Sequence, residues 1–251
     1  MSPRAPREPD ALPYFVTSRL LERHGLPHLF TTRHCPGIAR STESRPPLGP
    51  ESRPLLATRG LVGEPAFARQ VHGAEVIQVE RGGFAGHGDA LATSRAGLPL
   101  CISTADCLPI VLYDPRAGRL AAVHAGWRGT VRSVARATVA ALAEAGSAPG
   151  DLVVAIGPSI GPCCYEVDAP VLERLEGAFP GAWEPWATPK GPGKWMLDLW
   201  RANVDQLVAA GVPPEGIDLL GLCTGCRPDL LFSYRRERGA GRLVTVAALP
   251  G

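Results

Sequence analysis

The sequence predicts a single-domain protein of the α/β class, more specifically a mixed α+β fold, in which helices pack on a mixed sheet. The chain has 251 residues, of which 45% are apolar, and this is enough material for one large core. From residue 98 onward, short apolar runs of strand length are separated by turn residues. Amphipathic stretches of helical period lie between these runs, as expected where helices cover a sheet.

Two segments near the N-terminus lack such patterns. Residues 1–13 are rich in proline and charge, which predicts a disordered tail ahead of one domain spanning residues 14–251. Residues 35–56 combine five prolines with several charges and few apolar side chains. We expect a mobile loop in that segment, without a helix or a strand.

The elements of the remaining chain follow from periodicity. Apolar runs predict three strands at residues 99–104, 107–113 and 119–125. In residues 129–146, apolar side chains recur at steps of three and four, which predicts one amphipathic helix ending at Gly146. Similar patterns predict further strands at 152–157, 217–222, 230–234 and 242–249, and helices at 170–179 and 198–211.

Charge and composition exclude several classes of protein. The net charge is +2 and the basic residues are spread along the chain, so we expect neither a nucleic-acid partner nor a membrane surface. No apolar run approaches the roughly 18 residues that span a bilayer, and the N-terminus has no secretory signal, which predicts a soluble, cytoplasmic protein. The sequence leaves the oligomeric state open. Seven cysteines, an odd count, indicate reduced thiols that act as ligands or nucleophiles.

A predicted hairpin brings a cysteine and a histidine together. A four-residue loop at 114–117 would pair Tyr113 with Gly118 and, in the same register, Cys107 with His124. Their Cβ atoms would then lie roughly 4.5 to 5.5 Å apart, close enough to share one metal or to form a thiolate and imidazolium pair. His72, at the end of an extended run, could supply a third ligand. The alternative is that the cysteine is a small apolar residue of the core and the histidine a hydrogen-bonded structural residue.

Five blocks of the sequence resemble a known family. They are QVHG at 70–73, TADCLPIVLYD at 104–114, AAVHAGWRGT at 121–130, AIGPSIGPCCYEV at 155–167 and LFSYRRE at 231–237. Together they resemble the laccase-domain family, also called the multicopper polyphenol oxidase or purine nucleoside phosphorylase family. The resemblance covers about two thirds of the chain, from Gln70 to Arg242, and does not extend to residues 31–49.

This resemblance implies a metal site and an activity. It implies that His72, Cys107 and His124 hold zinc, with copper as the other candidate metal and one coordination position open for water or substrate. It also implies phosphorolysis of adenosine, inosine and methylthioadenosine to a free base and a sugar 1-phosphate, with deamination of adenosine as a second activity. The expected partners are therefore a purine nucleoside and phosphate.

Other polar residues of the blocks are candidates for the same site. Arg128 precedes the predicted helix, where a guanidinium and a helix N-terminus both favour an anion. Asp89 and Asp106 are the nearest carboxylates for orienting a ligand histidine or moving a proton, although a turn cap explains Asp89 equally well. We expect Asp106, Cys107 and His124 to be catalytic, and the substrate to be bound by Gln70, Asp89, Arg128, Ser159, Arg235 and Arg236.

Three other functions compete with this one. In a cysteine hydrolase acting on an amide, such as a peptidoglycan precursor, Cys107 would be the nucleophile and His124 its base. A copper polyphenol oxidase fits poorly, because multicopper sites need many histidines and the chain has six. A metal-binding partner protein without catalysis would leave the open coordination position unexplained.

The remaining cysteines allow a further site. Cys223 and Cys226 form a CxxC motif that, with Cys163 and Cys164, could make a structural zinc site. Adjacent cysteines are awkward ligands for one metal, however, and Cys223 follows an apolar strand. The sequence therefore argues against a shared site, and a redox motif has no thioredoxin-like pattern around it.

Overall fold

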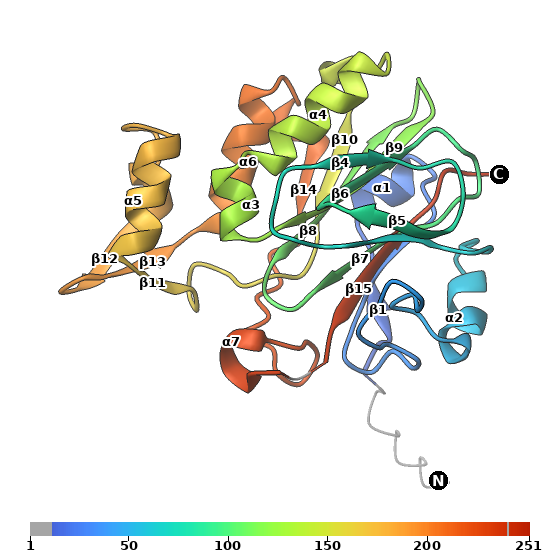
Figure 1. Ribbon diagram of the computed structural model, residues 1–251, viewed down its shortest axis with the longest axis horizontal. Helices are drawn as coiled ribbons and strands as arrows, with labels where there is room; N and C mark the ends of the chain where they lie inside the picture. Colours follow the sequence, from blue (N-terminus) through green and yellow to red (C-terminus); the bar gives the residue numbers. More distant parts are fainter. Residues whose placement is uncertain (1–11, 240) are drawn as a thin grey trace, which may run out of the picture.

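The computed structural model describes residues 12–239 and 241–251, so most of the predicted tail at 1–13 lies outside the described residues. Figure 1 shows the two larger sheets in the middle of the molecule with helices packed around them, which confirms the mixed α+β class and the single domain. Within the described residues, no helix is both long and apolar enough to cross a membrane.

Three sheets form the framework. The first has the order β1-β2-β15-β7-β3-β5, the second β14-β10-β8-β9-β6-β4, and the third β11-β13-β12. The strands of the first sheet are β1 (Phe15–Val16), β2 (His28–Thr31), β15 (Leu243–Ala247), β7 (Leu100–Thr104), β3 (Ala66–Arg69) and β5 (Gly83–His87). Those of the second are β14 (Ile217–Leu219), β10 (Val153–Ile156), β8 (Leu108–Asp114), β9 (Arg119–Ala125), β6 (Ala90–Thr93) and β4 (Val76–Gln78). The third contains β11 (Glu166–Asp168), β13 (Lys194–Leu197) and β12 (Ala187–Gly191).

The second sheet is buried on both faces. On β8, Val111 and Tyr113 belong to a cluster shared with Leu100 and Ile102 of the first sheet. The alternate residues Ile110 and Leu112 pack instead in the cluster with the helices. Because side chains alternate along a strand, continuous apolar runs are what a doubly buried strand requires. The predicted strands at 99–104, 107–113 and 119–125 are confirmed as β7, β8 and β9.

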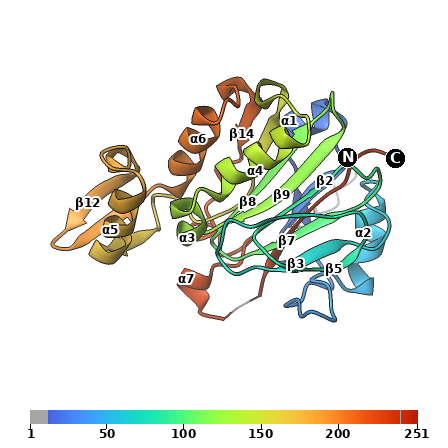
Figure 2. The same cartoon turned by 45° about the horizontal axis from the view of Figure 1, so that its top comes forward.

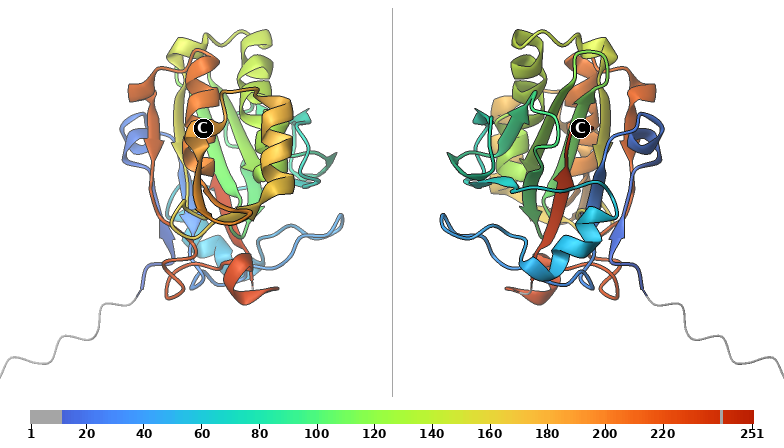
Figure 3. Two further views of the ribbon diagram at one scale, coloured as in Figure 1. Left: turned by 90° about the vertical axis from the view of Figure 1, so that its left-hand side faces the viewer. Right: turned by 90° about the vertical axis from the view of Figure 1, so that its right-hand side faces the viewer.

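Helices cover the outer face of the second sheet, and Figure 2 shows α4 and α6 lying over it. The helices are α1 (Arg19–Arg23), α2 (Arg53–Ala57), α3 (Trp127–Val131), α4 (Val134–Glu144), α5 (Ala169–Ala178), α6 (Leu199–Ala209) and α7 (Tyr234–Glu237). The 3-10 turns are Pro50–Ser52, Pro149–Asp151, Glu184–Trp186 and Pro214–Gly216. Helix α5 and the third sheet lie together at one end of the molecule (Figure 1), and the left view of Figure 3 looks onto that end.

The helix predicted at residues 129–146 is two helices in the structure. Ser133 adopts the left-handed conformation, with φ 58°, and separates α3 from α4. A left-handed residue cannot continue a right-handed helix, and the apolar periodicity does not report such a break. The predicted C-terminal glycine is confirmed, because Gly146 follows α4 with φ 102°.

Two further expectations are corrected. Residues 50–57 are not a loop but a 3-10 turn followed by α2, both of which have proline in the first turn, where its missing N–H costs nothing. The strand predicted at 230–234 is absent, and α7 begins at Tyr234 because the Ser233 hydroxyl accepts a hydrogen bond from the Arg236 N–H. The predicted helices at 170–179 and 198–211 and the strands at 152–157, 217–222 and 242–249 correspond to α5, α6, β10, β14 and β15.

The β8–β9 hairpin has a different register from the predicted one. Asp114 pairs with Arg119, so the four-residue loop is 115–118, and the Asp114 carboxylate accepts the N–H groups of Arg116 and Ala117. Pro109 therefore lies opposite His124, and Cys107 immediately precedes β8. The prediction that Cys107 lies directly opposite His124 is therefore wrong. The shift is two residues, however, and an even shift keeps a side chain on the same face of the sheet.

Candidate metal centre

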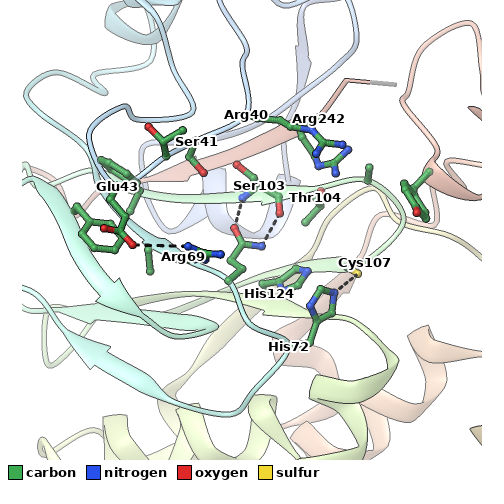
Figure 4. A pocket seen from close by; sticks show the side chains of 17 residues that line it. Arg40, Ser41, Glu43, Arg69, His72, Ser103, Thr104, Cys107, His124 and Arg242 are labelled. Carbon is green, nitrogen blue, oxygen red and sulfur yellow. Dashed lines mark hydrogen bonds and ion pairs between the residues drawn. The ribbon is translucent and has the colours of Figure 1, made fainter. Parts of the chain in front are cut away.

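His72, Cys107 and His124 converge in a pocket of about 920 Å³, a size typical of small-molecule sites. His72 follows β3, Cys107 precedes β8, and His124 lies on β9. Figure 4 shows these three side chains grouped in one part of the pocket, with Arg40 and Arg242 across from them. The pocket is lined by Arg40, Ser41, Thr42, Glu43, Phe67, Ala68, Arg69, Gln70, His72, Phe84, Ser103, Thr104, Ala105, Cys107, His124, Tyr234 and Arg242.

The ligand atoms of this group are close enough to share one ion. One atom from each of His72, Cys107 and His124 lies within 4.8 Å of the other two. The Cys107 Sγ is 4.0 Å from His72 Nε2, and the two imidazole rings lie edge to face with centroids 4.8 Å apart. Zinc bonds of about 2.0 to 2.3 Å to nitrogen and sulfur require only a small contraction of this group. The three residues could therefore hold zinc and leave a fourth position open.

Asp89 organises two of the three side chains. It is fully buried, and its carboxylate accepts the backbone N–H groups of Val71, His72 and Gly73 at 3.1, 2.9 and 2.6 Å. It also lies 2.7 Å from Nδ1 of His124, which leaves Nε2 of that ring for the centre of the site. The same backbone bonds hold His72 in a left-handed conformation with φ 59°. Asp89 thus orients His72 and His124 from a fully buried position, whereas the sequence placed it among the residues that bind substrate.

The electrostatics favour a charged thiol. Burial raises the pKa of Cys107, but His124 and His72 outweigh it and lower that pKa to about 6. Burial lowers the pKa of His124, while the Cys107 thiolate and Asp89 raise it to about 9. In the metal-free protein, Cys107 and His124 therefore form a thiolate and imidazolium pair near neutral pH. The thiolate is also the form that binds a metal.

Asp106 is held by hydrogen bonds to distant parts of the chain. Its φ is 87°, and its two carboxylate oxygens accept the Thr224 hydroxyl and the Arg235 N–H, each at 2.6 Å. It is buried and does not line the pocket. Asp106 therefore ties the loop of Thr224 and the start of α7 to the segment that carries Cys107, and its catalytic role stays a prediction.

Two residues of the predicted substrate set have other partners. Gln70 does line the pocket, but both ends of its amide bond the backbone of Ser103, at 2.7 and 2.9 Å. Ser159 is fully buried and accepts the indole N–H of Trp200 at 2.7 Å. Ser159 therefore lies in the packed interior, and its contact with substrate stays a prediction.

The three predicted arginines lie outside the pocket lining. Arg128 stacks over Trp127, its own neighbour, at 4.4 Å from the ring centroid. Arg235 stacks over Tyr165 at 4.9 Å and donates to the carbonyl of Glu166. Arg236 is exposed at the surface. That these three arginines bind the substrate stays a prediction.

Other basic residues, which the sequence did not single out, line the pocket. Arg40 comes from the segment predicted as a mobile loop, Arg69 ends β3 and Arg242 precedes β15. Burial and the nearby Arg40 lower the pKa of Arg242, so the two guanidinium groups face a common region. Isolated arginines in irregular segments carry no spacing signal, and only the tertiary fold reveals that they converge.

A second group of possible ligands lies outside this pocket. The sulfur atoms of four cysteines all lie within 4.8 Å of one another: Cys163, Cys164, Cys223 and Cys226. The sequence argument against a shared site for these cysteines therefore fails on geometry.

The chain belongs to the family described as multi-copper polyphenol oxidoreductase laccase, whose sequence profile matches residues 50–250. A Geobacillus stearothermophilus protein named purine nucleoside phosphorylase YlmD is 42% identical over 189 residues, covering 70% of this chain and 68% of that protein. The crystal structure of YlmD from that organism superposes with a TM-score of 0.82 at 34% identity, covering 90% of this chain and 93% of the other. The resemblance found in the sequence blocks is thereby confirmed.

Two other relatives carry names that bear on chemistry. A Deinococcus radiodurans protein named purine nucleoside phosphorylase is 37% identical over 239 residues, covering 90% of each chain. A protein named adenosine deaminase RL5, from an unknown prokaryotic organism, is 40% identical over 148 residues, covering 59% of this chain and 56% of that protein.

Proposed function

We propose that this chain is a zinc-dependent purine nucleoside phosphorylase that cleaves adenosine, inosine and methylthioadenosine, with adenosine deamination as a second activity. The names of its relatives support a purine nucleoside-processing enzyme. The observation that carries the proposal is the pocket itself, where the group of His72, Cys107 and His124 shares one cavity with basic side chains.

The donor set suits zinc, because two imidazoles and one thiolate are ligands that this ion prefers. When bound, the ion would supply Lewis-acid chemistry at the open position. Asp89 fixes the tautomer and orientation of His124, and it fixes the backbone from which His72 projects. Both are positioning functions, performed without contact to substrate.

The basic residues suit phosphate. Arg40 and Arg242 face a common region of the pocket, and a guanidinium binds phosphate oxygens in a bidentate manner. Phe84 and Tyr234 line the same pocket and offer aromatic faces to a purine base. In this proposal the nucleoside occupies the space between the metal ligands and the two arginines.

Product analysis with and without phosphate tests the activity. We expect the purified protein to convert inosine to hypoxanthine and ribose 1-phosphate only when phosphate is present. With adenosine we expect some inosine and ammonia to form even without phosphate. No nucleoside turnover in a zinc-loaded preparation, at any phosphate concentration, would contradict the proposal.

One observation favours a second candidate, a cysteine hydrolase. His124 lies between the Cys107 thiol and the Asp89 carboxylate, as the base does in a nucleophilic triad. A triad has no use for a second imidazole, however, whereas a metal site does, and His72 occupies that place 4.0 Å from Cys107. This contact is why we prefer the metal.

Metal content and adduct trapping separate the two mechanisms. We expect Cys107→Ser to lose the zinc of this pocket, and we expect the intact mass of protein quenched during turnover to carry no covalent adduct on Cys107. An adduct on that residue in an active, metal-free preparation would establish the hydrolase instead. Copper as the bound metal would appear directly in elemental analysis of the same samples.

A further inference from the structure

Four cysteines that do not line the pocket meet in two loops far apart in the sequence. Cys163 and Cys164 lie between β10 and β11, and Cys223 and Cys226 lie between β14 and α7. The Cys226 Sγ is 3.3 Å from that of Cys163 and 3.5 Å from that of Cys164. All four sulfur atoms lie within 4.8 Å of one another.

The backbone of both loops is shaped to bring the thiols together. In the first, the N–H groups of Cys164 and Tyr165 both donate to the carbonyl of Gly161, which makes a tight turn. This turn lets two adjacent cysteines contribute to one cluster. In the second, the N–H groups of Cys226 and Arg227 both donate to the carbonyl of Cys223.

The two loops also pack against each other without spare room. A Cβ on Gly225 would lie 2.8 Å from the Cβ of Cys164 and 2.9 Å from its Sγ. The Gly161 N–H donates to the Cys223 Sγ at 3.2 Å, a bond that stabilises negative charge on sulfur. Glycine at position 225 is therefore what allows the four thiols to approach.

We propose that Cys163, Cys164, Cys223 and Cys226 form a structural zinc site with four thiolate ligands. Zinc–sulfur bonds of about 2.3 Å in a tetrahedron place sulfur atoms about 3.8 Å apart, which lies within the observed range of separations. On binding, the ion displaces four thiol protons to solvent and no electron is transferred. Because all four positions are filled by protein, the site is closed and serves the fold.

A disulfide explains the cluster less well. It requires two sulfur atoms about 2.05 Å apart, and the Cys226 Sγ is 3.3 Å or more from those of Cys163 and Cys164. A single bridge would also leave two of the thiols unpaired. Cys226 is almost equally close to Cys163 and Cys164, so the geometry singles out no pair. A shared ion, in contrast, uses all four.

The site would also support the pocket. Thr224, inside the CxxC turn, donates its hydroxyl to Asp106, which precedes Cys107. The same carboxylate accepts the N–H of Arg235 at the start of α7. Zinc bound by the two loops would therefore also hold Thr224 in place. Thr224 in turn anchors Asp106, the neighbour of the proposed pocket ligand Cys107.

Zinc stoichiometry in variants of the full chain, purified anaerobically with a reductant, tests the proposal. Because the two centres use different residues, we expect about two zinc ions per wild-type chain and about one in each of His72→Ala and Cys226→Ser. The matched control is Cys35→Ser, which changes a cysteine outside the cluster and should leave the zinc content as in wild type. Cobalt-loaded His72→Ala should show the intense visible bands and the sulfur-to-metal charge transfer of a tetrahedral thiolate site, and the double variant His72→Ala/Cys226→Ser, which lacks both sites, should not.

The proposal also remains testable if Cys226→Ser fails to fold, because His72→Ala leaves the cysteine cluster intact. A folded His72→Ala protein that binds neither zinc nor cobalt would overturn it. Peptide mapping that finds a disulfide among these cysteines in freshly prepared reduced protein would overturn it as well. Full zinc content in folded Cys226→Ser, or the same cobalt spectrum in the folded double variant His72→Ala/Cys226→Ser, would also overturn the proposal.

Discussion

At the scale of single residues, the carboxylate of Asp89 accepts three successive backbone N–H groups and faces Nδ1 of His124. The pKa of Asp89 is lowered, because these bonds outweigh the burial that raises it. One buried group therefore sets both the turn that carries His72 and the tautomer of His124. It performs this function without exposure to the pocket.

We expect Asp89→Asn to lower both stability and zinc affinity. The side-chain NH2 group of asparagine would face the backbone N–H groups of Val71 and Gly73, donor to donor. The loss of these hydrogen bonds should lower the free energy of unfolding by about 1–3 kcal/mol. Zinc affinity at the pocket should fall by about 10- to 100-fold, as measured by competition with a chelator. Asp114→Asn is the matched control, since Asp114 is another buried carboxylate that accepts two backbone N–H groups, and zinc affinity should not change. Equal zinc affinities in the two variants would remove Asp89 from its positioning role.

A second prediction at this scale concerns Arg242. Replacing it by alanine removes a charged donor from the proposed phosphate region, so we expect the KM for phosphate to rise by about 10- to 100-fold while the KM for inosine changes little. Arg128→Ala is the comparison, because Arg128 stacks on Trp127 outside the pocket and its loss should leave both constants unchanged. The opposite pattern, in which the KM for phosphate rises in Arg128→Ala alone, would place the phosphate site at Arg128 instead of Arg242.

At the scale of elements, the approach of α3 to Cys107 and His72 depends on a glycine. Gly126 precedes α3, and a Cβ at this position would lie 2.8 Å from the Cys107 Sγ and 3.1 Å from the His72 Cδ2. The end of β9 can therefore pass directly beside the site only because residue 126 has no side chain. Its φ is −79°, which any residue can adopt. Glycine is therefore required by the lack of room for a side chain and not by the backbone conformation.

Gly126→Ala should accordingly damage the site more than the fold. The added methyl group would displace Cys107 or His72, and we expect loss of most pocket zinc and of most activity, with unfolding midpoints close to wild type. Elemental analysis and urea titration measure the two effects separately. Gly150→Ala is the control, since a Cβ there meets no atom within 4 Å. Normal zinc content in Gly126→Ala would show that the site tolerates the methyl group.

At the scale of the whole molecule, the sandwich of two six-stranded sheets supports the pocket. His72, Cys107 and His124 lie at one end of β3, β8 and β9, and these strands are held by the core between the sheets. Leu120 lies in that core, fully buried, on the strand that carries His124. Stability and site geometry are therefore linked through β9.

We expect Leu120→Ala to destabilise the protein by about 2–5 kcal/mol, because it opens a cavity between the sheets. The folded fraction at low temperature should still bind zinc, since Leu120 lies at the far end of β9 from His124. Leu219→Ala removes a partly exposed leucine from the edge strand β14 and should change stability by less than about 0.5 kcal/mol. Urea denaturation measures both, and equal midpoints would contradict the assigned core.

The sequence by itself determined the class of fold and the central strands, and it singled out His72, Cys107 and His124, which the structure brings together. Apolar runs and helical periodicity are local properties, so β7 to β10 and α4 to α6 could be predicted from them. The tertiary structure decided what depends on distant contacts. The two-residue shift of the hairpin follows from the Asp114 turn, and the break at Ser133 follows from a left-handed residue that periodicity cannot register. Arg40 and Arg242 share a pocket, and four cysteines share a cluster, only because folding joins segments whose separation in the chain carries no spacing signal.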